Sequence, residues 1–444
     1  MGVVSICFFV VCGGPIGSEQ IVSTGGPFMA ILGLLSYPLI CSAPFAYVLA
    51  ELCTVFPEDG GFTVWVMNAW GPFWGFQEGY WSWIAGVLNR AIFPGLIYSV
   101  ISQSCGFHLS SVGMYFFKAA IALVLTLPIL IGVRFAIRIT KVLMIVVIIA
   151  FGIFTVWAFG SPTATPVLGE IRRVNITVTD QGNYEVSGAA AIQWGSYFNM
   201  LYWSYHGFFL ASVFGGEVRN PAFTYPRAIC ISFAVICLTY LLPFLAAIVA
   251  NKPHWSTYKE NSFPVIASGV GGSALHSVVV VASVCGSIGM YMAQLFCEAF
   301  QVCGMPEIGL IPSFFKRRNA RFDTPHNSIM FSLVLILLLL ALDFEVVLGM
   351  TNAFTAAVEI LIMLSAIRLR STLPFVPRPV KVPGGIVGMA GILVAPAVSG
   401  IIFIINVFSK SFAPVMVMAL VLAGFIYGGY RKCRKDQLRA SDLL

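Results

Sequence analysis

The chain has 444 residues, of which 59% are hydrophobic and 10% are charged. Because an ordinary soluble domain carries about 25% charged residues, this composition excludes a soluble globular protein. The net charge of +7 does not indicate a nucleic-acid partner. In so apolar a chain, basic residues instead set the orientation of the loops across a membrane.

Apolar segments of about twenty residues recur along the chain, and each is long enough to cross roughly 30 Å of hydrocarbon. They predict an all-α polytopic membrane protein with about twelve transmembrane helices. The first segment lacks a basic lead and a small-residue cleavage site, so no signal peptide is expected. The predicted spans are 3–24, 27–50, 73–100, 115–133, 141–160, 191–214, 228–250, 273–300, 328–348, 351–367, 386–408 and 411–430.

Basic residues are distributed unevenly between these spans. With a cytoplasmic N-terminus, the inner loops and the tail hold 18 of the 25 Lys and Arg residues, and the outer loops hold five. This asymmetry predicts that both termini are cytoplasmic, with the plasma membrane as the expected location. The sequon Asn175-Ile176-Thr177 lies in the long loop assigned to the outside, where N-glycosylation can occur.

Neither a metal site nor an enzyme active site is predicted. The eleven cysteines lie mostly within apolar spans and lack metal-ligand spacing, and the five histidines fall on different segments. The glycine-rich run 269–274 lacks the lysine of a phosphate-binding loop. No cofactor is therefore expected. Any transport of a solute must be driven by a concentration gradient and not by ATP hydrolysis.

The first span is interrupted by the sequence "VCGGPIGSE" (11–19). A glutamate at the centre of a membrane helix costs about 2.5 to 3.5 kcal/mol or more. Close helix packing explains glycines in membranes, but it leaves Pro15 and Glu19 without a reason. Unwound backbone at membrane depth survives only where it lines a cavity or is buried in protein.

A second interruption is predicted five spans later, where Ser204-Tyr205-His206-Gly207 lies in the middle of the segment 198–221. Breaks in helices 1 and 6 are what two inverted repeats of five helices produce in secondary transporters. The freed backbone groups and half-helix ends then bind a polar solute. This pattern favours a transporter with its substrate site between the two breaks.

Four stretches resemble the amino acid–polyamine–organocation superfamily, and in particular its polyamine:proton symporter and L-type amino-acid transporter-like branch. They are "GGPIGSE" (13–19), "AELCTVFPEDGGFTVWV" (50–66), "GPFWGFQEGYWSW" (71–83) and "GGEVRNPAFTYPRA" (215–228). The resemblance implies alternating access, with proton coupling or exchange. It also implies a transporter domain over 1–430, with inverted repeats at about 3–160 and 191–367, two further helices over 386–430, and a short cytoplasmic tail at 431–444.

The resemblance also implies where the substrate binds. The break in helix 1 supplies backbone contacts and an acidic position, and the break in helix 6 supplies Tyr205 and its neighbours. Apart from the resemblance, Trp203 either caps the substrate as a lid or faces the bilayer. The implied contacts are Gly13, Gly14, Pro15, Ile16, Gly17, Glu19, Asn89, Trp203, Tyr205, His206 and Gly207.

Two departures from the branch pattern concern charge. In helix 3 the branch usually has Asp-Asn where this chain has Asn89-Arg90, and in helix 6 it usually has Tyr-Trp-Asp-Ser where this chain has Tyr205-His206-Gly207-Phe208. Because each buried positive charge of a polyamine needs a partner, the loss of both acids weakens the expectation of polyamine specificity.

Three residues have alternative roles. Glu19 binds a substrate amine, carries the coupled proton, or is a protonated side chain that satisfies backbone. His206 takes part in proton coupling or fills an aromatic gate. Arg90 replaces a coupling cation, binds a substrate carboxylate, or pairs with an acid. Glu78 lies about 18 Å from Arg90 along the same helix, so an acidic partner must come from another helix.

The remaining charged positions are less informative. Glu51, in the turn after helix 2, and Glu217, after helix 6, are interpreted as gate or fold architecture. Glu298 and Glu359 lie in apolar runs, so each should face protein or water. The basic cluster 431–435 is expected to meet anionic lipid headgroups.

The favoured function is therefore a secondary transporter for polyamines or amino acids. A neutral or cationic amino-acid exchanger is the main alternative, because Arg90 suits a zwitterion while the family resemblance suits a polyamine. A transporter-like amino-acid sensor is disfavoured, because such a receptor would need a large soluble domain. The expected partners are a small-molecule substrate and the lipid bilayer, with no nucleic acid, and the sequence leaves open whether there is a partner subunit.

Overall fold

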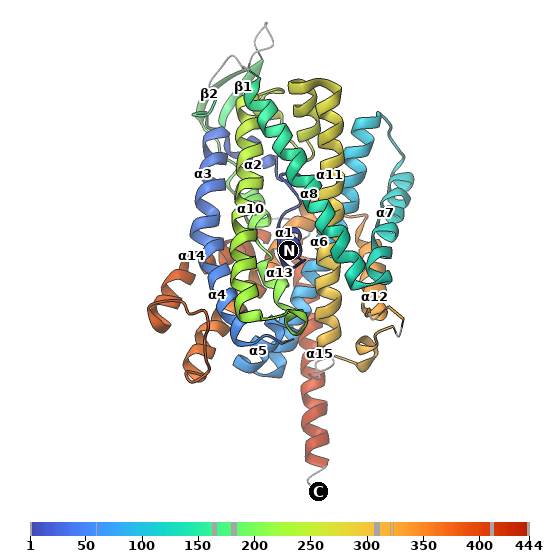
Figure 1. Ribbon diagram of the computed structural model, residues 1–444, viewed down its shortest axis with the longest axis vertical. Helices are drawn as coiled ribbons and strands as arrows, with labels where there is room; N and C mark the ends of the chain where they lie inside the picture. The colour runs from blue at the N-terminus through green and yellow to red at the C-terminus, as the bar shows by residue number, and fades with distance from the viewer. Residues whose placement is uncertain are drawn as a thin grey trace.

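The computed structural model is a bundle of helices with a β-hairpin at one end and the C-terminal helix projecting from the other (Figure 1). It describes residues 2–58, 60–161, 167–178, 184–305, 311–319, 321–322, 324–408 and 413–441. The first half of the bundle contains α1 (Gly2–Val11), α2 (Gln20–Gly25), α3 (Pro27–Tyr37), η1 (Pro38–Ser42), α4 (Ala43–Val55), α5 (Phe62–Trp70), α6 (Pro72–Cys105), α7 (Ser111–Ile131) and α8 (Val133–Gly160).

The hairpin of β1 (Arg173–Val178) and β2 (Tyr184–Ala190) leads into the second half. This half contains α9 (Trp194–Tyr205), η2 (Phe208–Ser212), η3 (Gly215–Glu217), α10 (Pro221–Ala250), η4 (Trp255–Thr257), α11 (Phe263–Gly304), η5 (Ser313–Lys316), α12 (His326–Leu339), α13 (Phe344–Thr372), α14 (Gly385–Val407) and α15 (Ala413–Ser441). The two antiparallel strands add a small sheet to the predicted all-α fold.

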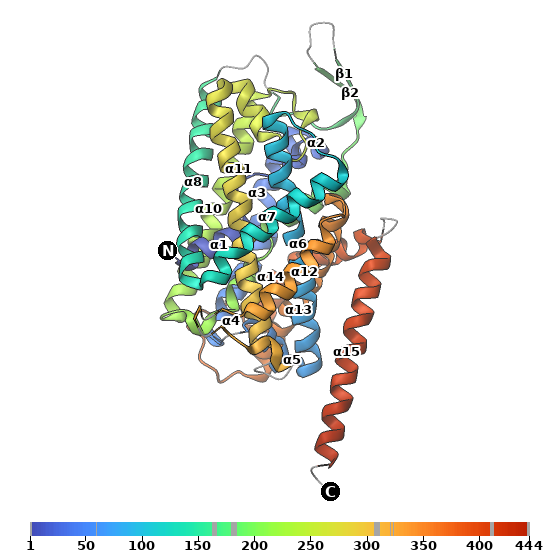
Figure 2. The ribbon, with the colours of Figure 1, turned by 90° about the vertical axis from the view of Figure 1, so that its right-hand side faces the viewer.

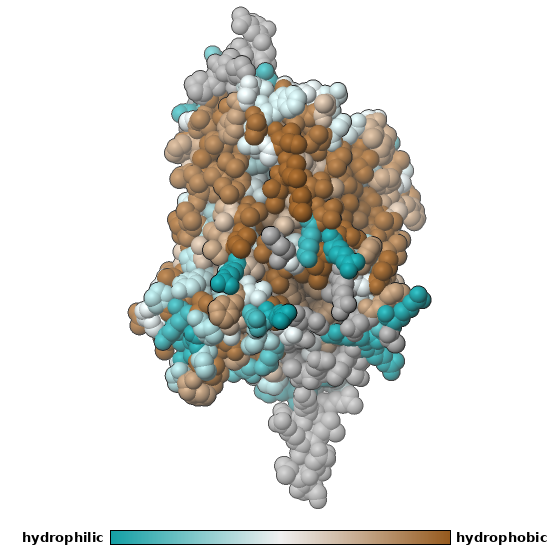
Figure 3. Space-filling model, in the orientation of Figure 1, coloured by the Kyte–Doolittle hydropathy of each residue, from teal (hydrophilic) through white to brown (hydrophobic). Residues whose placement is uncertain are grey.

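Membrane-spanning helices dominate the described residues. Nine helices there are long and apolar enough to cross a bilayer. The three other predicted spans fall on the interrupted pairs α1–α2 and α9–η2 and on the short apolar helix α12. Figure 3 shows hydrophobic residues over the middle and upper part of one face, where α8, α10 and α11 lie, with hydrophilic residues below them. The protein is a polytopic helical membrane protein.

One predicted boundary is wrong. The span 328–348 joins two helices, because α12 ends at Leu339 and α13 begins at Phe344. Asp343 has an extended backbone and stands at the N-cap position of α13, where an aspartate is strongly preferred. The apolar residues on both sides of this turn concealed it.

The helix α1 begins at one edge of the bundle, at mid-height, and runs inward (Figure 2). It packs against α8, α10 and α11, and residues 4–11 are all buried. A helix that is apolar on all sides is stable only when protein or lipid surrounds it completely. The first half of the interrupted helix 1 is therefore held by the core of the protein.

Glu51 forms ion pairs at the end of the bundle where the loops rich in Lys and Arg lie. It is 2% exposed and forms ion pairs with Arg370 (3.0 Å) and Arg378 (3.1 Å). The backbone N–H of Val382 donates to the same carboxylate at 2.8 Å. Glu51 thus ties α4 to the end of α13 and to the segment before α14.

The turn after α4 packs against η2, which is the second part of the sixth predicted span. This span, formed by α9 and η2, is called helix 6 below, and α1 with α2 is called helix 1. The N–H of Gly60 donates to the carbonyl of Val213 at 3.0 Å, and the N–H of Phe62 donates to Ser212 Oγ at 3.2 Å. A Cβ on Gly61 would overlap Ser212. The turn between α4 and α5 is thereby joined to the end of η2 at this face of the protein.

We expect Glu51→Gln to destabilise the folded protein, because Arg370 and Arg378 would lose their anionic partner while remaining buried. Breaking a buried ion pair costs about 3 to 5 kcal/mol, so the apparent melting temperature of purified protein should fall clearly. Glu58→Gln is the matched control, because Glu58 is exposed in the same turn. Equal melting temperatures for the two variants would contradict a structural role for Glu51.

Candidate functional site

The first helix is interrupted as predicted. The helix α1 ends at Val11 and α2 begins at Gln20, with no regular α-helix between them. Gly14 (φ +100°) and Gly17 (φ +81°) adopt left-handed backbone conformations, which glycine enters at little cost. The glycines therefore permit the unwound path, and Pro15 stands between them.

The sixth helix breaks at the predicted position as well. The helix α9 ends at Tyr205, His206 is extended (φ −90°, ψ 170°) and Gly207 is left-handed (φ +103°). The 3-10 helix η2 then continues to Ser212.

The two breaks lie against each other. A Cβ on Gly207 would stand 2.8 Å from the carbonyl oxygen of Val10, in the last turn of α1. Gly17 faces the ring of Trp203 in α9, at 3.1 Å from its virtual Cβ. The unwound segments of helix 1 and helix 6 are thus in direct contact.

Close packing accounts for some of the same glycines. A Cβ on Gly13 would stand 2.9 Å from the carbonyl oxygen of Gly286 in α11, and a Cβ on Gly14 would stand 2.8 Å from the ring of Phe151 in α8. Ile16 is buried in the same region. Packing and unwinding are therefore both properties of this segment, not alternatives.

A chain of side-chain hydrogen bonds joins α1, α6, α9 and α11. Trp203 Nε1 donates to Asn89 Oδ1 at 2.9 Å, and Asn89 Nδ2 donates to Gln294 Oε1 at 3.0 Å. Gln294 Nε2 in turn donates to the carbonyl of Val10 at 3.3 Å. Asn89 and Trp203 thus belong to one network, which ends on a carbonyl that the break in helix 1 leaves without a helical partner.

Sequence reasoning missed Gln294. A signal was available, because Gln294, Glu298 and Gln301 are polar residues at helical spacing within a largely apolar helix. All three sit on the face of α11 that meets α6, where Gln301 Nε2 donates to the carbonyl of Gly79 at 2.9 Å. Such spacing indicates a buried polar face.

Arg90 pairs with Glu298 of α11. The two side chains are 0% and 1% exposed, and a Cβ on Gly86 would overlap the Glu298 carboxylate. The expected partner from another helix is thus found, and Glu298 faces protein as anticipated. The positive charge of Arg90 is neutralised within the core.

Glu19 lies fully buried directly before α2. Neither carboxylate oxygen has a hydrogen-bond partner, although the backbone of residues 261 and 263 lies near the carboxylate. Among the described residues, no hydrogen bond or ring contact joins Glu19 to Tyr205 or His206. The carboxylate therefore faces the loop before α11 and not the aromatic side of the helix 6 break.

A second carboxylate does reach the helix 6 break. Tyr202 donates its hydroxyl hydrogen to Glu359 Oε2 at 2.9 Å, while Glu359 Oε1 has no partner. The ring of His206 lies 5.1 Å from that of Tyr202, and neither of its nitrogens is hydrogen-bonded. The sequence left Glu359 unassigned. Its hydrogen bond to Tyr202 joins α13 to the last turn of α9, directly before the break in helix 6.

These groups surround a small cavity of about 20 Å³. That volume suffices for one water molecule, so a larger solute requires the surrounding helices to move. Its lining is Tyr37, Cys41, Ser42, Phe45, Tyr202, Tyr205, His206, Glu359 and Pro396.

Comparison with known proteins identifies the family. Residues 2–426 match the sequence model of a family described as amino acid permease. The chain belongs to the amino acid permease family. It is a membrane transporter, and its unwound helices 1 and 6 are parts of a permease.

The curated relatives of this permease include transporters named for polyamines. It is 31% identical to a protein of Arabidopsis thaliana named a "probable polyamine transporter", over 96% of this chain and 82% of the relative. It is 29% identical to the polyamine transporter RMV1 of the same plant, over 95% and 83%. Polyamine transporter PUT1 of Oryza sativa subsp. japonica is 31% identical, over 95% and 76%.

Three further predicted positions of the permease lie away from the breaks. Glu51 is part of the network at the basic end, and the side chain of Glu217 lies outside the described residues. Gly215, two residues earlier, packs against the backbone of Pro57 and Glu58. Asn175 is exposed in β1, at the opposite end of the bundle (Figure 1).

We expect Glu298→Met alone to lower the apparent melting temperature strongly, because Arg90 would become an uncompensated buried charge. Such a loss costs about 3 to 5 kcal/mol, whereas replacing both partners by apolar residues is often neutral. The double variant Arg90→Met/Glu298→Met should therefore recover most of the lost stability. A double variant that is less stable than Glu298→Met would argue against this pairing.

Proposed function

We propose that this permease carries polyamines across the membrane by alternating access, with the substrate bound between the breaks of helices 1 and 6. Polyamines have several positive charges, each of which needs a partner when it is buried. The observation that carries the proposal is the pair of buried, incompletely hydrogen-bonded carboxylates, Glu19 and Glu359, one beside each break.

The neutralisation of Arg90 supports a cationic substrate. A free arginine in the cavity would repel an amine and attract a carboxylate. Because Arg90 is paired with Glu298, its charge offers a substrate carboxylate little attraction. The names of the plant relatives point to the same substrate class.

The substrate contacts belong to this proposal. The unwound residues 12–19 supply carbonyl and amide groups, and His206 and Gly207 supply them on the opposite side. Tyr205 donates its hydroxyl hydrogen to the carbonyl of Leu34 at 3.2 Å and borders the small cavity together with Tyr202. Trp203 covers Gly17 and contacts Phe344, with ring centroids 6.3 Å apart, as a lid would.

Proton coupling is the second part of the proposal. Glu19, Glu359 and His206 are buried groups whose proton occupancy can change as the site opens to water. A proton that binds one of these groups while the amine binds another, and that is released with the amine on the other side, would couple the two movements in the same direction.

The arrangement of the chain supports two repeats, over about 3–160 and 191–367, followed by the helices of 386–430. In each repeat the first helix is the interrupted one, as inverted repeats require. The basic end and the C-terminal helix lie opposite the hairpin that carries Asn175 (Figure 2). Together with the distribution of Lys and Arg residues between the loops, this supports cytoplasmic termini and a hairpin outside the plasma membrane as part of the proposal.

A neutral or cationic amino-acid exchanger is the second candidate function. It is favoured by the unwound backbone of residues 12–19, because half-helix ends at such breaks bind the carboxylate group of anionic or zwitterionic substrates in other transporters.

Uptake into proteoliposomes separates these functions. Labelled spermidine, putrescine, arginine and leucine should be compared with and without an inward proton gradient. We expect uptake of spermidine and putrescine, accelerated by the gradient. Leucine or arginine uptake without polyamine uptake would contradict the proposal and support the exchanger.

We expect Glu359→Gln to lower kcat/KM for spermidine by about 10- to 100-fold, because a charged hydrogen bond contributes about 1.5 to 3 kcal/mol. The amide keeps an acceptor for Tyr202, so folding should be preserved. Glu19→Gln should have an effect of the same order. Glu185→Gln is the control, because Glu185 is exposed on β2 and should leave uptake unchanged. Normal uptake and pH dependence in both core variants would exclude these carboxylates from the site.

A further inference from the structure

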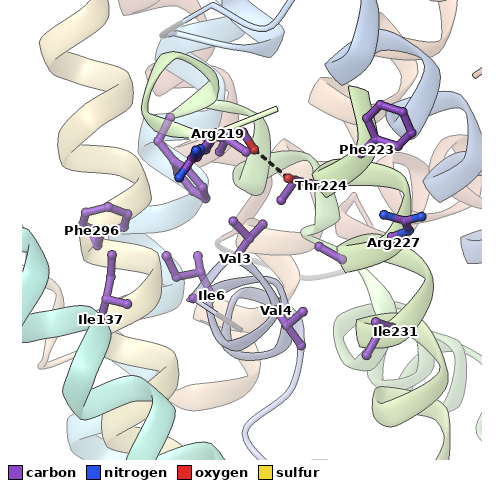
Figure 4. A pocket seen from close by; sticks show the side chains of 14 residues that line it. Val3, Val4, Ile6, Ile137, Arg219, Phe223, Thr224, Arg227, Ile231 and Phe296 are labelled. Carbon is purple, nitrogen blue, oxygen red and sulfur yellow. Dashed lines mark hydrogen bonds between the residues drawn. The ribbon is translucent and has the colours of Figure 1, made fainter. Parts of the chain in front are cut away.

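A second cavity, of about 620 Å³, lies beside the first turns of α1 (Figure 4). It is bounded by α1, the start of α8, the start of α10 and α11, so it lies at the end of the bundle that carries the basic loops. Its volume falls within the range of about 300 to 1,000 Å³ typical of ligand sites. Its lining is Gly2, Val3, Val4, Ile6, Ile137, Phe214, Val218, Arg219, Phe223, Thr224, Arg227, Ala228, Ile231 and Phe296.

The charged side chains of this lining are Arg219 and Arg227. In the described part of the chain, neither guanidinium forms an ion pair with an acidic residue. Arg227 lies over the ring of Phe223 at 5.6 Å, and the hydroxyl of Thr224 donates to the backbone carbonyl of Arg219 at 2.7 Å. Both arginines are exposed. Lys141 of α8 lies beside Gly2 and adds a third positive charge nearby.

The remainder of the cavity is apolar. Val3, Val4 and Ile6 face it from α1, while Ile137 and Phe296 close the opposite side (Figure 4). At the rim, Phe223 is 66% exposed and Ile231 is 51% exposed. Both belong to α10, which is apolar and long enough to span the bilayer, so this rim faces lipid.

The sign of the charge excludes the proposed substrate from this cavity, because a polyamine would meet two arginines of like sign. A small soluble anion would satisfy the arginines but would leave the apolar walls unused. A molecule with an anionic head and a hydrocarbon tail matches both parts. Basic pockets between membrane helices on the cytoplasmic side recognise anionic lipid headgroups in this way.

We propose that this cavity binds an anionic phospholipid, with its phosphate at the arginine-bearing rim and one acyl chain against α1. The bound lipid would pack directly on Val3 and Val4, in the first half of the interrupted helix 1. Lipid composition would then influence the half-helix that borders the substrate site. The binding itself does not depend on which solute the permease carries.

Native mass spectrometry of the purified full chain tests the binding. Protein extracted from vesicles of phosphatidylcholine with phosphatidylglycerol should retain one tightly bound phosphatidylglycerol. The double variant Arg219→Gln/Arg227→Gln should bind it about 30-fold more weakly, because each basic residue near an anionic surface contributes roughly five-fold. Retention equal to that of the unmodified protein would overturn the proposal.

Two further variants distinguish a built site from general surface charge. Arg431→Gln/Lys432→Gln removes the same charge from α15 and should keep the bound lipid; loss of that lipid would show a surface effect only. Ile231→Trp keeps both arginines but narrows the apolar rim, so it should also weaken retention. Unchanged retention in this variant, or displacement of the lipid by glycerol phosphate, would show a headgroup site without an acyl chain and would overturn the proposal as stated.

Discussion

The constraint on which this structure depends is the need to satisfy backbone groups where two helices unwind inside the membrane. A helix that ends at Val11 leaves its last carbonyls without partners, and hydrocarbon offers none. The protein answers by surrounding α1 with α8, α10 and α11 and by directing Gln294 at the carbonyl of Val10. Unpartnered polar atoms of Glu19, His206 and Glu359 lie beside the breaks, where a solute can bind them.

Charge is controlled by the same principle. An unpaired arginine in the core would have a prohibitive free-energy cost, and Arg90 is paired with Glu298. Gly86 leaves the space that the Glu298 carboxylate occupies. Glu51 is likewise matched by Arg370 and Arg378 at the basic end. Against this background of paired charges, Glu19, Glu78 and Glu359 are buried carboxylates without complete hydrogen bonding, which is costly. Glu19 and Glu359 are the two that lie beside the helix breaks.

The sequence predicted the features that local chemistry determines. Glycines and a proline inside the first apolar segment indicated its break, and Tyr205-His206-Gly207 indicated the break in helix 6. The pairing of Arg90 with Glu298 and the approach of Glu359 to Tyr202 were not predicted in detail. Each joins residues far apart in the chain, and the rotation of one helix against another decides which acid meets which partner. The turn at Asp343 was missed for a simpler reason, because apolar residues continue on both sides of it.

A structure of the permease determined by electron cryomicroscopy in the presence of spermidine tests the central claim most directly. Our account predicts density for an extended cation between the unwound segment 12–19 and residues 206–207, with one amine at the Glu359 carboxylate. Density bound elsewhere in the bundle, or helices 1 and 6 wound continuously through the membrane, would contradict it.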